Sequence, residues 1–262
     1  MENKENEILE LFGLNFNNLS FNEALDKITF LIDCNKKIVI FTVNVAHITK
    51  INEDPNIRNI YYKADLILND SQVLYFASRM LGKPLKGKIS GSDLLPALCK
   101  VASLKGYHIF FLGGRNNASH YAAEKLKQTY KSVQIVGTIS PAFGFEKEAY
   151  EVDKIIKEIN KVKPQILFIG LGFPKQEVFI NEYRDRLNVN LIIGIGASFE
   201  FASSIIKRAP KWMQDFALEW LYRLIKEPKR LWKRYLFSNT LFILLFAKMY
   251  FKKVFRQNKN KL

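Results

Sequence analysis

The stretch QILFIGLGFPKQE, residues 165–177, joins an apolar run to a glycine turn and then to the start of a helix. Its first residues have the length and composition of a buried strand. Gly170 and Gly172 end that strand, and Pro174 suits the first helical position, where the N–H that proline lacks would have no partner inside the helix. The stretch therefore predicts a strand, a tight turn and a helix in succession.

The same alternation of short apolar runs and helical patterns continues outward through the first 200 residues, without an internal repeat. Ser20 and Glu23 form a capping box in front of a helix that we expect over residues 22–34. The strands that we expect cover residues 37–43, 65–69, 107–112, 133–136, 165–169 and 190–195. Strands that alternate with helices are typical of a parallel sheet, so the sequence predicts the α/β class.

Small or polar residues follow each expected strand, and the carboxyl ends of parallel strands share the edge where open α/β sheets bind ligands. Asp70 follows an apolar strand, which suits a general base, but aspartate is also a preferred N-cap and a helix can begin at Ser71. Thr42 and Asn44 suit hydrogen bonds to a sugar or ribose, or a strand-to-helix turn that Asn44 caps. Sequence position alone leaves these alternatives open.

Two glycine turns offer backbone N–H groups to an anion. Gly113 and Gly114 precede Arg115 and an expected helix, an arrangement that holds phosphate in many proteins. The turn at residues 170–172 repeats it, but fails as a dinucleotide fingerprint because Lys175 occupies the third glycine position. Each turn also suits tight backbone packing alone.

The sequence indicates no metal site. His47 lies near the same edge, but no second His or Cys stands at metal-ligand spacing, which favours a structural histidine. The chain has no Asp-x-Asp pair, so it lacks the paired carboxylates that hold a divalent cation against a diphosphate. If a nucleoside diphosphate leaves during a reaction, Lys, Arg and backbone N–H groups must balance its charge. We therefore expect no metal and no cofactor.

The composition excludes several classes of protein. The chain has 262 residues, of which 48% are hydrophobic and 25% charged, as in a globular domain. Two cysteines are too few for a disulfide framework, so we expect a reducing compartment. The charged N-terminus lacks the apolar segment of a secretory signal, and no apolar run approaches the ~18 residues of a spanning helix.

The net charge of +15 is concentrated at the end of the chain, because residues 207–262 contain 15 Lys or Arg against three acids. Apolar residues recur there at helical spacing; they are Met213, Phe216, Trp220 and Leu224. They predict one continuous helix that Pro228 breaks before a second begins near Lys229. The second helix mixes aromatic and basic residues, as interfacial helices do. Such a tail requires an anionic partner, either a membrane surface or nucleic acid.

Several segments resemble, in the same order, those of the WecG/TagA/CpsF bacterial glycosyltransferases, glycosyltransferase family 26. They are TVNVAHI at 42–48, ADLILND at 64–70, GKP at 82–84, SGSDLL at 90–95, FLGG at 111–114, GLGFPKQE at 170–177, KRAP at 207–210, EWLYR at 219–223 and EPKRL at 227–231. The PKQE, RAP and EWLYR elements are specific enough to make coincidence implausible.

The resemblance implies a Rossmann-like catalytic core, residues 1–206, and a basic helical appendage, residues 207–262, that docks to the membrane and completes the site. It implies inverting, metal-independent transfer of a hexose, often N-acetylmannosamine, from a UDP-sugar to N-acetylglucosamine on a polyprenyl diphosphate. The implied place is the cytoplasmic face of a bacterial plasma membrane, at its anionic surface. The implied base is Asp70, and the implied substrate contacts are Thr42, Asn44, Lys88, Gln176, Arg223, Arg230 and Lys233. The glycine turns add Gly113, Gly114, Gly170 and Gly172 to the candidate site.

Three points stay open on the sequence. Lys88 and Lys233 stand where the family has arginine, and lysine lacks the bidentate geometry of a guanidinium. The first alternative is therefore a family member that uses another sugar donor, such as UDP-glucose or UDP-N-acetylmannosaminuronate, in capsule or exopolysaccharide synthesis. A basic nucleic-acid-binding nucleotide sensor is the second alternative, but no nucleic-acid motif occurs, so we expect no nucleic-acid partner. The third is assembly into a homo-oligomer.

Overall fold

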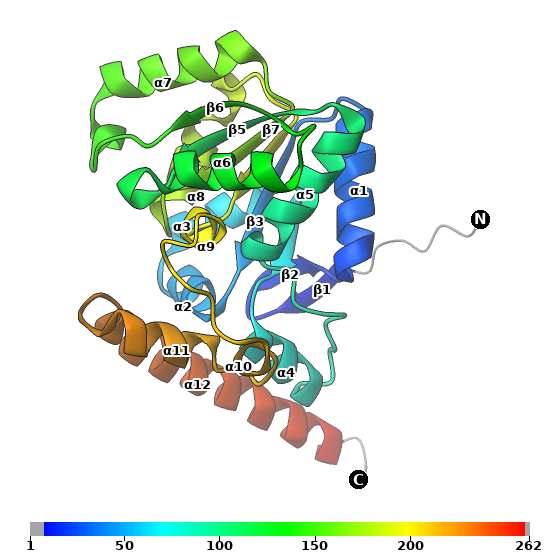
Figure 1. Ribbon diagram of the computed structural model, residues 1–262. Coiled ribbons are helices and arrows are strands. Elements are labelled where there is room, and N and C mark those ends of the chain that lie inside the picture. The colour runs from blue at the N-terminus through cyan, green and yellow to red at the C-terminus, as the bar shows by residue number, and fades with distance from the viewer. Residues whose placement is uncertain (1–7, 260–262) are drawn as a thin grey trace.

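The computed structural model describes residues 8–259, with side chains through residue 255, and centres on a six-stranded parallel sheet (Figure 1). In spatial order the strands are β4 (Leu66–Asn69), β3 (Ile38–Val43), β8 (Leu191–Gly194), β7 (Ile166–Gly170), β5 (His108–Gly113) and β6 (Gln134–Ile139). Each corresponds to one of the expected strands, and β6 runs three residues beyond its expected end at residue 136. The α/β class is confirmed.

Alternate residues of the central strands enter apolar cores on opposite faces of the sheet, which is the period-two pattern of a strand buried on both sides. In β3, Val39 and Phe41 enter one core, whereas Ile38 and Ile40 enter the other. The first core is completed by α2 (Val45–Glu53), α3 (Pro55–Tyr62), α4 (Gln72–Met80), α7 (Ala149–Val162) and α8 (Lys175–Tyr183). The second is completed by α1 (Phe21–Asp33), α5 (Gly91–Lys105), α6 (Ala118–Thr129) and α9 (Ser198–Ala202). Single 3₁₀ turns, η1 (Arg115–Asn117), η2 (Phe145–Lys147) and η3 (Arg184–Arg186), lie in the loops.

The capping box that the sequence predicts is confirmed at the start of α1. The Ser20 hydroxyl accepts a hydrogen bond from the backbone N–H of Glu23 at 3.3 Å, and the Glu23 carboxylate accepts one from the backbone N–H of Ser20 at 2.7 Å. The helix begins one residue earlier than expected, at Phe21.

The hairpin of β1 (Ile8–Leu11) and β2 (Leu14–Asn17) is not among the predicted elements. Phe12 and Gly13 form its two-residue turn with φ values of 52° and 79°, the signs that a type I′ turn requires. Phenylalanine is an unusual residue for such a turn, which hides the signal, but its side chain is buried against the core. Asn17 Oδ1 accepts the Ile67 N–H at 2.8 Å, so the hairpin lies against edge strand β4.

The predicted continuous helix before Pro228 is wrong, because the chain forms α10 (Lys211–Asp215) and α11 (Glu219–Lys226) instead. Ala217 adopts the left-handed conformation at φ 61°. The N–H of Leu218 bonds to the carbonyl of Met213 at 2.7 Å, and the N–H of Ala217 to that of Gln214 at 3.3 Å. This is the Schellman pattern that ends a helix, with alanine where glycine is usual. The break turns α11 relative to α10.

Helix α12 (Pro228–Lys259) begins at Pro228, as the sequence predicts within one residue, and lies across the body below α2 and α4 (Figure 1). Leu231 and Phe242 are buried on its inner side, where the Phe242 ring lies 5.2 Å from the ring of Phe12 in the hairpin turn. Lys253 Nζ donates to the carbonyl of Met80 at 2.9 Å, which holds the far end against α4. None of the helices within residues 8–259 combines the length and the apolar composition that crossing a bilayer requires.

Candidate active site

A cavity of about 1040 Å³ lies between the carboxyl edge of the sheet and helices α10–α12. The turns after β3, β4, β7 and β8 contribute its core wall, which includes Thr42, Asn44, Asp70, Gly170, Gly172 and Gln176. The appendage contributes the second wall, which includes Glu219, Arg223, Arg230 and Arg234. Most of the predicted site residues, far apart in the sequence, therefore meet around one space.

Asp70 follows β4 and lines this cavity. Its backbone N–H bonds to the carbonyl of Val43 at 2.8 Å, which ties the end of β4 to the end of β3. The N-cap interpretation of Asp70 is wrong, because Ser71 caps α4 by accepting the Leu74 N–H on its hydroxyl at 3.3 Å. The Asp70 carboxylate accepts no hydrogen bond from the side chains or backbone described here, so it remains free for a ligand.

The surroundings of Asp70 favour its protonated form more than water does. Burial, foremost, and then the charge of Glu219 raise the pKa of Asp70 to about 7. Asp93 adds to the rise, while Lys88 and Arg208 oppose it. A carboxyl group with this pKa exchanges protons near neutral pH, as a general base must.

Asn44 acts as the cap that the sequence allowed and also lines the cavity. Its Oδ1 accepts the Ala46 N–H at 3.1 Å at the start of α2, which leaves its amide nitrogen for a ligand. His47, in the first turn of the same helix, is buried beside Phe173, and its Nδ1 accepts the Asn44 N–H at 3.4 Å. Burial, with the charge of Arg234, lowers the pKa of His47 to about 3, so the ring is a neutral structural element. Within the described part of the chain, His, Cys, Asp and Glu form no group of three that could hold a metal ion.

The two glycine turns differ in their position relative to the cavity. Gly170 and Gly172 line the cavity, whereas Gly113 and Gly114 do not. The Gly114 N–H donates to the carbonyl of Gly170 at 2.9 Å, and the Arg115 N–H donates to Glu200 Oε1 at 3.2 Å. These two donors therefore already have partners, and the phosphate site at Gly113 and Gly114 stays a prediction. A Cβ at Gly113 would lie 2.5 Å from the Gly170 oxygen, so close strand packing explains the first glycine.

Gln176 is a buried link between two of the turns. Its Oε1 accepts the Gly196 N–H at 3.0 Å, and its Nε2 donates to Glu177 Oε1 at 2.9 Å. Glu177, which sequence reasoning missed, is 1% exposed; its Oε1 also accepts from the Tyr61 hydroxyl, and its Oε2 has no partner among the described residues. Burial raises the pKa of Glu177 to about 7.

The appendage cations divide into two groups. Arg223, Arg230 and Arg234 line the cavity, but Lys233 is exposed, with its ammonium 5.5 Å from the centre of the Trp232 ring. The family resemblance implied Lys233 as a substrate contact, whereas Arg234, four residues after Arg230 and thus on the same side of the helix, is the neighbour that lines the cavity. Burial, followed by the charges of the other two arginines, lowers the pKa of Arg234, which indicates an unbalanced positive cluster.

Arg223 does not form the helical pair with Glu219 that its spacing allows. Its guanidinium lies 5.5 Å from the centre of the Phe201 ring, and its Nε is buried without a partner among residues 8–255. Arg230 is held by Glu227, with both contacts at 2.6 Å. The arginine cluster thus has more donors than the appendage satisfies.

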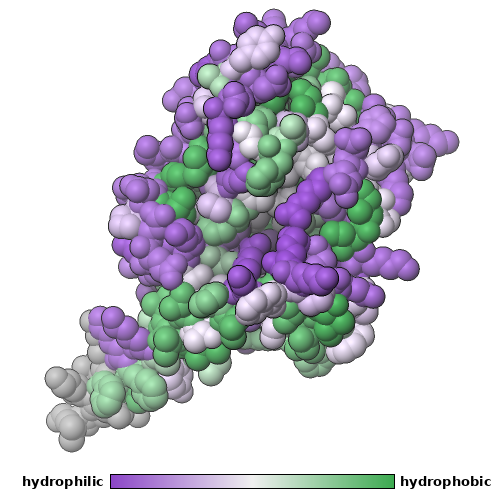
Figure 2. Space-filling view, turned by 90° about the vertical axis from the view of Figure 1, so that its left-hand side faces the viewer, coloured by the Kyte–Doolittle hydropathy of each residue, from purple (hydrophilic) through white to green (hydrophobic). Residues whose placement is uncertain are grey.

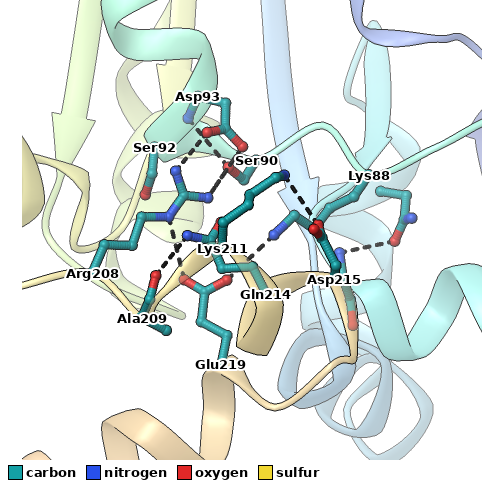
Figure 3. A network of polar contacts seen from close by, with 12 residues as sticks. Lys88, Ser90, Ser92, Asp93, Arg208, Ala209, Lys211, Gln214, Asp215 and Glu219 are labelled. Carbon is teal, nitrogen blue, oxygen red and sulfur yellow. Dashed lines mark hydrogen bonds and ion pairs between the residues drawn. The ribbon is translucent and has the colours of Figure 1, made fainter.

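Glu219 instead joins a network that links the appendage to the core (Figure 3). Its Oε2 lies 3.3 Å from Lys88 Nζ, and its Oε1 lies 3.5 Å from Arg208 Nε. Both terminal nitrogens of Arg208 also donate hydrogen bonds to the Asp93 carboxylate, at 2.5 and 3.1 Å. Lys88 also lines the cavity. Arg208 was missed as a site residue, although it stands in the RAP element that the sequence singled out.

Residues 9–257 match the Glycosyl transferase WecG/TagA/CpsF family. The chain belongs to this family. Similar proteins include the N-acetylglucosaminyldiphosphoundecaprenol N-acetyl-beta-D-mannosaminyltransferase of Bacillus spizizenii, 34% identical over 79% of this chain and 78% of that protein. A Bacillus subtilis protein of the same name is 33% identical over 85% of this chain and 84% of its own. One from Staphylococcus aureus is 26% identical over 85% and 86%, respectively.

Membership in the WecG/TagA/CpsF family makes the protein a glycosyltransferase. Several of the motifs that carried the resemblance line the cavity. The TVN element ends β3, the PKQE element begins α8, and the EWLYR element forms most of α11. A single chemical site therefore explains why segments so distant in the chain share one pattern.

Proposed function

We propose that this protein transfers N-acetylmannosamine from a UDP-sugar to N-acetylglucosamine on undecaprenyl diphosphate, with inversion at the anomeric carbon. The names of its relatives support this acceptor and this sugar. The observation that carries the proposal is a free, weakly acidic carboxyl, Asp70, on the core wall of a cavity whose appendage wall holds an unbalanced arginine cluster. A proton acceptor and a diphosphate site are what this reaction requires.

In the proposed reaction, the Asp70 carboxylate takes the proton of an acceptor hydroxyl while that oxygen bonds to the anomeric carbon. The bond from this carbon to the UDP oxygen breaks, and its electron pair leaves on the β-phosphate. Attack from the face opposite to the leaving group inverts the anomeric configuration. Base catalysis of this kind contributes about 10²–10⁴-fold to a rate.

The arginine cluster stabilises the departing diphosphate. The charges of Arg223 and Arg230 repel that of Arg234, so an anion bound among the three arginines offsets this repulsion. Preorganised donors aimed at developing charge are typically worth about 10²–10³-fold each.

Polar groups of the core wall suit the two ends of the donor. Thr42 and Asn44, beside Asp70, bind the transferred sugar. Glu200 is buried beneath the cavity, and its Oε2 has no donor among the described residues. A carboxylate oxygen of this kind suits the hydroxyl groups of a ribose.

We further propose that residues 1–206 form the catalytic core and residues 207–262 the appendage that brings it to an anionic membrane, on the cytoplasmic face where UDP-sugars occur. The appendage has an exposed apolar face, which includes Trp212, Phe216, Ile225, Trp232, Leu236, Phe237, Leu241, Ile243, Leu244, Phe251 and Phe255. Figure 2 shows hydrophobic surface gathered along the lower end of the molecule, below a largely hydrophilic body. Basic residues beside such a face add about 1 kcal/mol each near anionic lipid.

The direct test uses the full chain, a short-chain lipid diphosphate bearing N-acetylglucosamine, and a panel of UDP-sugars. We expect the mass of the lipid product to rise by one N-acetylhexosamine with UDP-N-acetylmannosamine, and NMR coupling to show an anomeric configuration opposite to that of the donor. Preferred use of UDP-glucose or of UDP-N-acetylmannosaminuronate would correct the donor. Retention of configuration would contradict a single displacement at Asp70.

A further inference from the structure

Two cations, Lys88 and Arg208, act on the charge of Asp70. Lys88 comes from the loop before α5 and Arg208 from the start of the appendage, before α10, and both line the cavity with Asp70. A direct ion pair with either one would make Asp70 a weak base, since an opposite charge within ~4–6 Å lowers the pKa of an aspartate by about 1–3. The structure shows neither pair.

Other carboxylates occupy both cations (Figure 3). Asp93 accepts hydrogen bonds from the two terminal nitrogens of Arg208, and the Ser90 hydroxyl donates to the same carboxylate at 2.5 Å. Glu219 lies 3.3 Å from Lys88 Nζ and 3.5 Å from Arg208 Nε, so it is the one carboxylate in this network that contacts both cations. The Lys88 and Glu219 side chains are only 14% and 27% exposed, which limits screening of their charges by water.

We propose that Glu219 is a positioning residue for the transfer reaction: by holding Lys88 and Arg208, it keeps both cations from pairing with Asp70 and leaves that carboxylate free to accept a proton. This inference rests on the proposed function of Asp70 as the base. Because Glu219 begins α11, the contact also makes the strength of a core base depend on a side chain of the appendage.

The balance of charges around Asp70 supports this role. The groups that act on it are Lys88, Asp93, Arg208 and Glu219, two cations against two carboxylates. Without the charge of Glu219, two cations face Asp93 and Asp70 alone, so ionised Asp70 becomes the group that balances them. Lys88 would also lose its partner, and its flexible chain could turn toward Asp70.

A variant that removes the charge but keeps the shape, Glu219→Gln, tests the proposal, with Asp215→Asn as the matched control. Asp215 is also an appendage carboxylate in an ion pair, 3.0 Å from Lys211, but it is 56% exposed and does not line the cavity. The first measurement is the pH dependence of carbodiimide coupling of an amine to Asp70, followed by peptide mass spectrometry. Only a protonated carboxyl reacts, so the midpoint reports the ionisation of Asp70 without any need for sugar transfer.

We expect the pH midpoint of coupling to lie near 7 in the unchanged protein. It should fall by about one pH unit or more in Glu219→Gln and stay unchanged in Asp215→Asn. Removing the unpartnered cation as well, in Glu219→Gln with Lys88→Met, should return the midpoint toward its original value. An unchanged midpoint in Glu219→Gln, or an equal shift in Asp215→Asn, would overturn the proposal.

The second measurement is the pH profile of transfer. A weaker base should lower kcat at pH 8 by about tenfold, while the acid limb of the profile moves to lower pH. A merely structural contact would lower activity without moving that limb. If the unchanged protein transfers no sugar, the proposed function fails, whereas the coupling midpoints still decide the role of Glu219.

Discussion

The core wall and the appendage wall of the cavity carry opposite unbalanced charges. On the core side, Asp70 has no hydrogen-bond partner, and one oxygen of Glu200 is buried without a donor among the described residues. On the appendage side, one nitrogen of Arg223 has no partner among the described residues, and Arg234 is half-buried and repelled by the charges of two other arginines. These acids and bases do not pair with each other within residues 8–255. Buried charges usually find partners, so their separation across a cavity indicates that a polar ligand belongs between them.

The largest expected effect comes from removing the acidic group of the core wall. Asp70→Asn keeps the size of the side chain but cannot accept the proton, so kcat should fall by at least about 10²-fold. Binding of UDP, measured by calorimetry, should change little because the arginines remain. Transfer within threefold of the unchanged protein would remove Asp70 from the mechanism.

The appendage wall offers a test between adjacent residues. Arg234→Gln removes a half-buried guanidinium from the cavity, and we expect kcat/KM to fall by about 10²-fold. Lys233→Gln removes an exposed cation of the same charge one residue earlier, and should stay within about twofold on a short-chain acceptor in detergent. Equal losses in the two variants would mean that general positive charge, rather than the cavity, binds the diphosphate.

The outer side of the appendage should matter for membranes and not for chemistry. Phe237 and Leu244 are 64% and 63% exposed, and replacing both with Glu should weaken binding to anionic vesicles by more than about tenfold, through lost apolar burial and added repulsion. Leu104→Glu is the matched control, because Leu104 is 80% exposed but lies on α5 of the core. Vesicle sedimentation measures the binding. If the double variant sediments as before, the exposed apolar face is not the anchor.

The smallest expected effect is on the free energy of unfolding, and it distinguishes a buried glutamate of the core from an exposed one. Burial raises the pKa of Glu177 from 4.5 to about 7, so the folded state binds its proton more tightly than the unfolded chain. Glu177 therefore destabilises the protein increasingly as pH rises from 4.5 to 7, and fully above that range. Glu177→Gln should raise the free energy of unfolding by about 1–3 kcal/mol at pH 8 and hardly at pH 4.

Thermal unfolding at the two pH values checks this difference. Glu124→Gln serves as the control, because Glu124 is 57% exposed and should give no pH-dependent gain. A gain of equal size at pH 4 and pH 8 in Glu177→Gln would mean that packing, not charge, explains it.

The core side of the site was the more predictable half. Asp70, Thr42, Asn44 and Gln176 all lie at the sheet edge, because each follows a strand or opens a helix that local hydrophobic patterns reveal. The exception is the turn at Gly113 and Gly114. Its local sequence resembles a phosphate-binding turn, but its donors bond to Gly170 and Glu200, residues that are distant in the chain.

The appendage was less predictable because its helices change direction. A break at Ala217 and another at Pro228 each reset which residues of the following helix face inward. The family resemblance implied Lys233 as a substrate contact, and helical spacing allows a pair between Arg223 and Glu219. In the structure Arg234 faces the cavity, and Glu219 contacts Lys88, 131 residues away.

By itself the sequence determined the class of the fold, the edge that bears the site and the cationic, aromatic character of the appendage, since strand periodicity, turn residues and net charge are local properties. Only the tertiary structure decided which charged groups meet and which remain without partners. Charge pairing depends on distances between atoms that the chain brings together after hundreds of backbone angles are set, and a single left-handed residue such as Ala217 changes the result.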